Sequence, residues 1–155
     1  MRENIYPVIV FAHAGVRHMA LDAHSSERLR SWLRSRHYQP ENVNERRDRF
    51  PRDVPLCQAV RENNREMIYF LLASGARVND RDHQGAYPLH LACSNDNIEV
   101  MAELCAKGAM VSQADVYGNA PLWVASERGF LRGLEWLREH VRNFLQSCFF
   151  SPLNI

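Results

Sequence analysis

Lysine is almost missing from this sequence, because 18 of its 19 basic residues are arginine and the other is Lys107. Net charge is nearly missing too, at +1 over 155 residues, which is ordinary for one globular domain. No stretch reaches the roughly 18 apolar residues that a membrane-spanning helix needs, so we expect a soluble protein. Apolar residues are not scarce: they make up 46% of the chain against 24% charged, which excludes wholesale disorder.

The motifs of nucleotide binding and of hydrolytic catalysis are also absent. The sequence contains neither G-x-x-x-x-G-K nor G-x-G-x-x-G, and neither G-x-S-x-G nor H-E-x-x-H. His13, His18 and His24 are spaced by 5 and 6 residues, so one helix face would not carry all three as metal ligands. The sequence therefore predicts a protein that is not an enzyme and that holds no metal and no cofactor.

The four cysteines show no pattern of pairing or metal binding. They include no C-x-x-C pair and have no histidines at zinc-site spacing. All of them lie in helix-like apolar patterns, where a free thiol packs as a small hydrophobic group. We therefore expect reduced, buried cysteines and an intracellular, cytoplasmic protein. The four are Cys57, Cys93, Cys105 and Cys148.

What the sequence does contain is an internal repeat with a period of 33 residues. The segment 55–59, Pro-Leu-Cys-Gln-Ala, recurs in the pattern P-L-x-x-A at 88–92 and at 121–125. Bulky apolar, glycine and aspartate positions keep the same register: Leu71, Leu104 and Leu137; Ile68, Met101 and Leu134; Gly75 and Gly108; Gly85 and Gly118; Asp82 and Asp115. So many matches at one shift indicate a repeated structural unit.

Each repeated position has a physical reason. The three prolines should each open a short helix, because the fixed φ of proline suits the first turn and its missing N–H would be unpaired there anyway. The next special position holds Asn63, Asp96 and Gly129, residue types that tolerate a left-handed backbone between two helices. A second helix with an apolar stripe follows, and Gly75 and Gly108 should end it.

This unit of helix, turn, helix and finger loop resembles the ankyrin repeat. The resemblance is firm over residues 49–140, and its fullest copy runs from Asp82 to Ala109. It implies an all-α solenoid of about four helix-turn-helix units, with β-hairpin-like fingers at 76–86 and 109–120. In a looser, degenerate first copy, Leu29 and Trp32 match Met101 and Leu104. We expect a single domain over 1–155, made of a cap segment at 1–15, the degenerate repeat at 16–48, repeats at 49–81 and 82–114, a capping repeat with an extended helix at 115–148, and a tail at 149–155.

The sequence departs from the family pattern at several positions. The threonine that usually precedes each proline is replaced, by Val54, Tyr87 and Ala120. Only His90 keeps the motif histidine, so stability should rest more on burial between repeats than on the usual Thr-to-His hydrogen bonds. Gly133 lies inside the last expected helix, where it costs about 1 kcal/mol relative to alanine. No glycine ends that helix, which can run from Leu131 toward Cys148.

The resemblance implies that the fingers and first helices bind another protein, as in a non-catalytic adaptor or inhibitor. Tyrosine, histidine and arginine suit such a surface, and Tyr117 and Arg128 are the strongest candidates. Trp123 replaces the motif histidine; it would either anchor a partner or pack internally, and the replacement favours packing. The expected partner-binding residues are Phe50, Arg61, Glu62, His83, Gln84, Ser94, Asn95, Tyr117, Asn119, Glu127 and Arg128.

Two alternatives stay open. The arginine-rich segment 46–52 would suit a nucleic-acid-binding protein, although acidic residues interrupt it and Phe50 is its one aromatic residue. At the carboxyl end, Phe149 and Phe150 would either offer a surface for self-association or fold back as a cap, and we favour the cap.

Charge is distributed unevenly along the chain. Residues 53–127 hold ten acidic and five basic side chains, whereas 17–52 and 128–155 carry net charges of +4 and +2. This distribution would favour a partner that has its own charge asymmetry.

Overall fold

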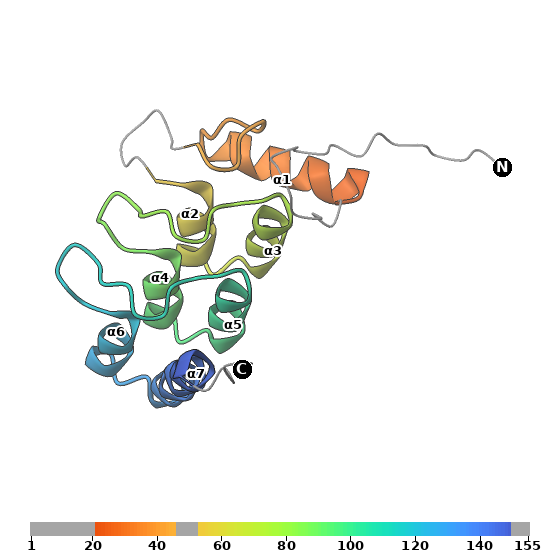
Figure 1. Ribbon diagram of the computed structural model, residues 1–155. Helices are drawn as coiled ribbons and strands as arrows, with labels where there is room; N and C mark the ends of the chain where they lie inside the picture. The colour runs from red at the N-terminus through yellow and green to blue at the C-terminus, as the bar shows by residue number, and fades with distance from the viewer. Residues whose placement is uncertain (1–20, 46–52, 150–155) are drawn as a thin grey trace. The chain divides into compact units, whose positions relative to one another are not determined.

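The computed structural model describes residues 21–45 and 53–149, and shows them as helices joined by loops with no β-strand (Figure 1). The chain divides into two compact units, Met1–Pro88 and Leu89–Ile155, and each is described by itself. The expectation of a single domain stays a prediction. None of the described helices is long and apolar enough to cross a membrane. The helices are α1 (Ala23–Ser35), α2 (Pro55–Arg61), α3 (Arg65–Ala73), α4 (Pro88–Ser94), α5 (Ile98–Ala106), α6 (Pro121–Glu127) and α7 (Leu131–Phe149).

The first unit contains a helix pair, α2 and α3, built as the repeat pattern predicts. Pro55 opens α2 after an extended Val54. Asn63 turns the chain with a positive φ of 51°, and the Asn64 side chain caps α3 by accepting from the N–H of Met67 at 3.2 Å. Gly75 then ends the helix with a φ of 85°, in the conformation that glycine adopts most readily.

Burial in the first unit joins these two helices and α1. Helix α2 packs against α3, and Leu56, Val60, Ile68 and Leu71 are fully buried. Helix α1 also contacts α3 and buries the stripe that contains Leu29 and Trp32. Because α1 is the one helix described before residue 53, the degenerate repeat at 16–48 stays a prediction.

The second unit repeats these local devices in α5, α6 and α7. Asp96 has a φ of 50°, and the side chain of Asn97 caps α5 by accepting from Val100 N–H at 3.1 Å. Gly108 ends α5 and Gly129 joins α6 to α7, with φ values of 91° and 70°. Helix α7 runs through to Phe149, which confirms that no signal stops it after the usual length. Its contact with α6 and α5 encloses a core that includes Met101, Leu104 and Leu137.

Gly133 has a packing role that its sequence position does not reveal. A Cβ atom added there would lie 2.9 Å from Oδ1 of Asp96 and 4.0 Å from the side chain of Met101. The glycine therefore gives α7 room to pass these two side chains, which offsets its poor helix propensity.

The finger loops are closed by turns without strands. Asp82 N–H donates to the carbonyl of Ala86 at 2.8 Å, and Asp115 N–H donates to that of Asn119 at 2.9 Å. The aspartate carboxylates also accept backbone N–H groups inside their own turns, as Asx turns do. These bonds explain why both repeats have an aspartate at the start of the finger turn. Three residues later the turn requires a positive φ, 82° at Gly85, which glycine adopts readily.

Candidate partner-binding surface

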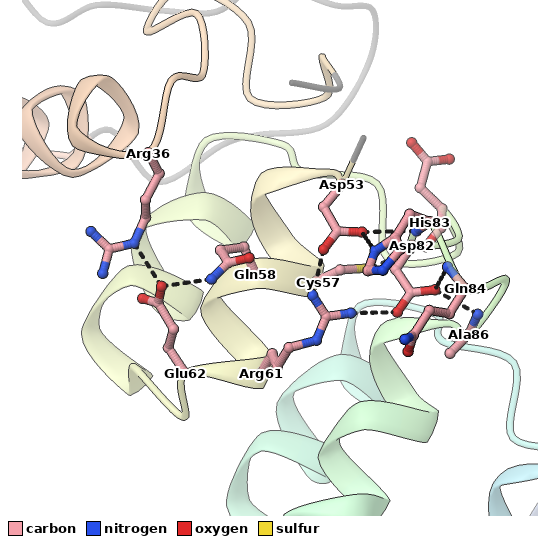
Figure 2. A network of polar contacts seen from close by, with 11 residues as sticks. Arg36, Asp53, Cys57, Gln58, Arg61, Glu62, Asp82, His83, Gln84 and Ala86 are labelled. Carbon is pink, nitrogen blue, oxygen red and sulfur yellow. Dashed lines mark hydrogen bonds and ion pairs between the residues drawn. The ribbon is translucent and has the colours of Figure 1, made fainter. Parts of the chain in front are cut away.

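The first unit contains an ionic network at the base of its finger (Figure 2). Arg61, the last residue of α2, lies between two carboxylates: one guanidinium nitrogen donates to Asp53, and the other lies 2.6 Å from Oδ2 of Asp82. Both carboxylate side chains are fully buried, whereas that of Arg61 is one-third exposed. The guanidinium therefore bonds to both buried carboxylates at once and fixes the finger turn to α2.

His83 completes this network. Its backbone N–H donates to Oδ1 of Asp53 at 2.8 Å, and its ring Nδ1 lies 2.9 Å from the same oxygen. Burial by itself raises the pKa of Asp53, but the hydrogen bonds from His83 and Arg61 outweigh it and hold that pKa below its usual value. Asp53 is therefore a carboxylate at neutral pH.

Glu62 is held in a second polar cluster between helices α1 and α2. Its Oε1 accepts from Arg36 Nε and from Gln58 Nε2, both at 2.7 Å. Burial opposes ionisation of Glu62, but these donors lower its pKa below the usual value. Arg61, Glu62 and His83, three of the expected partner-binding residues, thus have internal partners, whereas Gln84 is exposed and uses its backbone N–H to close the turn.

Asp53, Asp82 and His83 also form a group whose potential ligand atoms lie within 4.8 Å of one another. Carboxylate and imidazole groups can hold a divalent cation. Arg61, however, already supplies positive charge to both carboxylates. We therefore assign this group a structural role.

Sequence reasoning did not single out Asp53, which directly follows the arginine-rich segment 46–52, and so missed its role. The repeat register gave no signal, since the equivalent residues one and two periods later are Ala86 and Asn119. Arg61 lies eight positions after Asp53 and His83 lies 30 positions after it, so only the folded chain brings the three together.

In the second unit, Ser94 and Asn119 take part in local contacts. Ser94 donates its hydroxyl to the carbonyl of Leu91 at 2.9 Å. Asn119 contributes its backbone carbonyl, which lies 2.8 Å from Nε2 of the buried His90. Asn95 is exposed at the end of α4.

The other expected residues of this unit are open to solvent. The side chain of Tyr117, at the tip of the second finger, is 77% exposed, and its neighbour Val116 is also exposed. Glu127 and Arg128 are exposed at the end of α6, and within the described part of the chain their side chains make no ion pair. Trp123 is 58% exposed, so the expectation that it packs internally was wrong.

Several predictions concern residues that the structure does not describe. Phe50 and the arginines of segment 46–52 lie outside the described ranges, and so does Phe150. Phe149 ends α7, but its side chain also lies outside them. The nucleic-acid alternative and the self-association surface at Phe149 and Phe150 therefore stay predictions.

Comparison with known proteins identifies the repeat. A family model described as ankyrin repeats, in three copies, matches residues 56–146. The chain belongs to the ankyrin-repeat family. It thus has the all-α helical-repeat fold that the sequence predicted, with seven helices in its described part. Over 42 residues it is 45% identical to an ankyrin repeat protein of fowlpox virus (strain NVSL), a match that covers 27% of this chain and 9% of the viral protein.

Membership of this family has a general functional meaning. Ankyrin repeats generally mediate protein–protein interaction, and the family is typically non-catalytic. Three of the four cysteines are free in the structure, and burial raises the pKa of Cys93 to about 12 and that of Cys105 to about 11. A thiol with such a pKa is almost entirely protonated at neutral pH and is therefore a poor nucleophile.

Proposed function

We propose that this ankyrin-repeat chain is an adaptor or inhibitor that binds a partner protein through its finger loops and first helices, without catalysis. The observation that supports this most is the exposure of Tyr117 at the tip of a finger closed by Asp115. Tyrosine brings a large contact area and loses little conformational entropy when it is fixed, so it is a common anchor in interfaces. The closed turn also reduces the cost of ordering the loop on binding.

Arg128 supplies the second anchor. It follows α6 directly and is exposed, and its guanidinium is free to form a bidentate pair with a carboxylate of the partner. Arg61 and His83 have a different role in this proposal, because their contacts with Asp53 and Asp82 shape the first finger. They support the binding surface, and the residues of the second unit provide most of the binding energy.

The experiment compares proteins captured from native lysate by immobilised wild type and by a Tyr117→Ala/Arg128→Ala double variant, identified by mass spectrometry. We expect the variant to lose at least one partner while its circular dichroism spectrum stays unchanged. The matched control is Arg65→Ala/Tyr69→Ala, which removes an exposed arginine and an exposed tyrosine from α3. If the Tyr117/Arg128 variant captures the same proteins as wild type, the assignment of this surface is wrong.

A further inference from the structure

The first finger has an exposed arginine, Arg81, at its base. Arg81 directly precedes Asp82, and Tyr87 directly follows Ala86. Because Asp82 N–H donates to the carbonyl of Ala86, Arg81 and Tyr87 lie opposite each other on the two arms of the finger. The repeat register does not conserve this pair. Its equivalents one period earlier and one period later are Asp48 with Val54, and Ala114 with Ala120.

Tyr87 holds the guanidinium of Arg81 in place. Arg81 Nε donates to the hydroxyl oxygen of Tyr87 at 2.8 Å, and Arg81 Cζ lies 5.2 Å from the centre of the tyrosine ring. A guanidinium over an aromatic face is attracted by the negative potential of the ring. Tyr87 itself is only 7% exposed, so it is part of the packed repeat. The guanidinium of Arg81 is therefore ordered before any partner binds.

The acidic residues beside Arg81 in the sequence are bound by other groups. Both carboxylate oxygens of Asp82 are occupied, one by Arg61 and the other by N–H groups of the finger turn. Asp80 pairs with Arg77 at 3.1 Å. Within the residues that the structure describes, Arg81 makes no ion pair, and its Nη atoms have no hydrogen-bond acceptor. The terminal N–H groups of an exposed, ordered arginine are thus left for a ligand.

The chemistry of the guanidinium indicates what that ligand is. With Nε bonded to Tyr87, the two Nη atoms still offer two N–H groups in a planar fork, which matches the two oxygens of a carboxylate. A protein partner presents carboxylates on its aspartate and glutamate side chains. Since Arg81 has already lost much of its rotational freedom, pairing with such a carboxylate costs less conformational entropy than pairing with a mobile arginine.

We propose that Arg81 binds an aspartate or glutamate of the partner protein and so selects partners that present an acidic residue at this point. Arg81 is the contact residue, and Tyr87 is a positioning residue that acts through it. This rests on the proposed function, to which it adds a specificity-determining residue in the first unit and the chemical class of the group that this residue takes.

Selection of peptides from a random library displayed on phage tests the acidic preference. We expect immobilised wild type to enrich peptides with aspartate or glutamate at one position, and Arg81→Ala to lose that enrichment. The matched control is Arg65→Ala, which removes an exposed arginine from α3 and should select the same peptides as wild type.

A selected peptide then serves as the probe in a double-mutant cycle. Replacing its acidic residue by the corresponding amide should weaken binding to wild type about tenfold or more, because a charge-assisted pair is lost, but should leave binding to Arg81→Ala unchanged. Tyr87→Phe keeps the ring and removes the hydroxyl. It should weaken binding of the acidic peptide about threefold, through the restored mobility of Arg81, and leave binding of the amide peptide unchanged. A purely structural effect of Tyr87 would weaken both peptides alike.

The ordering of Arg81 can be measured without a ligand. By NMR, the heteronuclear NOE of the Nε nitrogen should be higher for Arg81 than for Arg65, and it should fall to the Arg65 value in Tyr87→Phe. The circular dichroism spectrum of that variant should stay unchanged, because its buried ring is retained.

The proposal is wrong if Arg81 is as mobile as Arg65 in the wild type. It is also wrong if the selected peptides have no acidic preference or bind Arg81→Ala as well as wild type; either result would leave the proposed function intact, because peptides still bind. A phosphoserine peptide that binds wild type more tightly than the acidic peptide, with the gain lost in Arg81→Ala, would make this a phosphate site instead. A wild type that enriches no peptide would contradict the proposed function as well.

Discussion

Replacement of Asp53 by asparagine is the sharpest test of the ionic network in the first unit. Asparagine has nearly the same shape as aspartate but no charge, so packing is kept while the attraction to Arg61 is lost. Asp53 accepts from Arg61 and from two nitrogen atoms of His83, and its side chain is fully buried. The variant also leaves Arg61 with one carboxylate partner, Asp82.

The magnitude follows from the burial of the partners. A hydrogen bond to a buried charged group contributes about 1.5–3 kcal/mol, and breaking a fully buried ion pair costs about 3–5 kcal/mol. Arg61 is one-third exposed, so water screens part of its attraction to Asp53. We therefore expect Asp53→Asn to lower the free energy of unfolding by about 2 kcal/mol at pH 7.

This cost should depend on pH in a defined direction. The pKa of Asp53 is below its usual value in the folded protein, so the unfolded chain binds the proton more readily. The stabilisation is therefore complete above the unfolded pKa of about 4 and is lost as pH falls through the folded pKa. The difference between wild type and Asp53→Asn should consequently shrink below about pH 4.

Urea unfolding followed by circular dichroism at pH 7, 5, 4 and 3 measures this difference. The control is Asp80→Asn, because Asp80 forms an ion pair with Arg77, whose side chain is 65% exposed. That variant should cost less than about 1 kcal/mol at every pH. The reasoning is refuted if Asp53→Asn costs no more than the control at pH 7, or if its cost is the same at pH 3 as at pH 7.

Two further predictions concern the second unit. Gly133→Ala should raise the free energy of unfolding in urea by less than the roughly 1 kcal/mol expected from helix propensity, because the new Cβ would meet Asp96 Oδ1. In an Asp96→Gly background the same substitution should raise it by the full amount of about 1 kcal/mol, and equal gains in the two backgrounds would contradict the steric explanation. Cys93, with its pKa of about 12, should react with iodoacetamide at pH 8 about a thousandfold more slowly than a free thiol, as measured by mass spectrometry. In urea, where the chain is unfolded, it should react at the rate of a free thiol, and fast labelling of the folded chain would contradict its burial.

The backbone of the repeats could be predicted from the sequence because local chemistry determines it. Pro55 and Pro121 open helices, and Asn63 and Gly108 adopt positive φ, as their residue types favour. The long α7 also followed from the missing stop signal after Leu131. Each of these predictions depends on a few neighbouring residues, which a sequence displays directly.

The candidate site was less predictable because it depends on partners that are distant in sequence. Arg61 and His83 were expected to face a partner protein, but buried carboxylates of the same unit bind them. Trp123 was expected to pack because it replaces the motif histidine, but it is exposed. The repeat register gives the position of a residue in its unit, but it does not show whether another segment covers that position.

The two fingers have nearly the same turn but differ in how they are tied to their helices. In the first, Arg61 holds Asp82; in the second, Ser94 occupies the position of Arg61 and bonds within its own helix, so Asp115 has no ion pair in the described part of the chain. Opening the first finger must therefore separate buried charges, whereas opening the second breaks only neutral contacts and the turn's own bonds. Amide hydrogens should exchange with solvent sooner in the second turn, which makes the loop around Tyr117 the more adaptable of the two in shape.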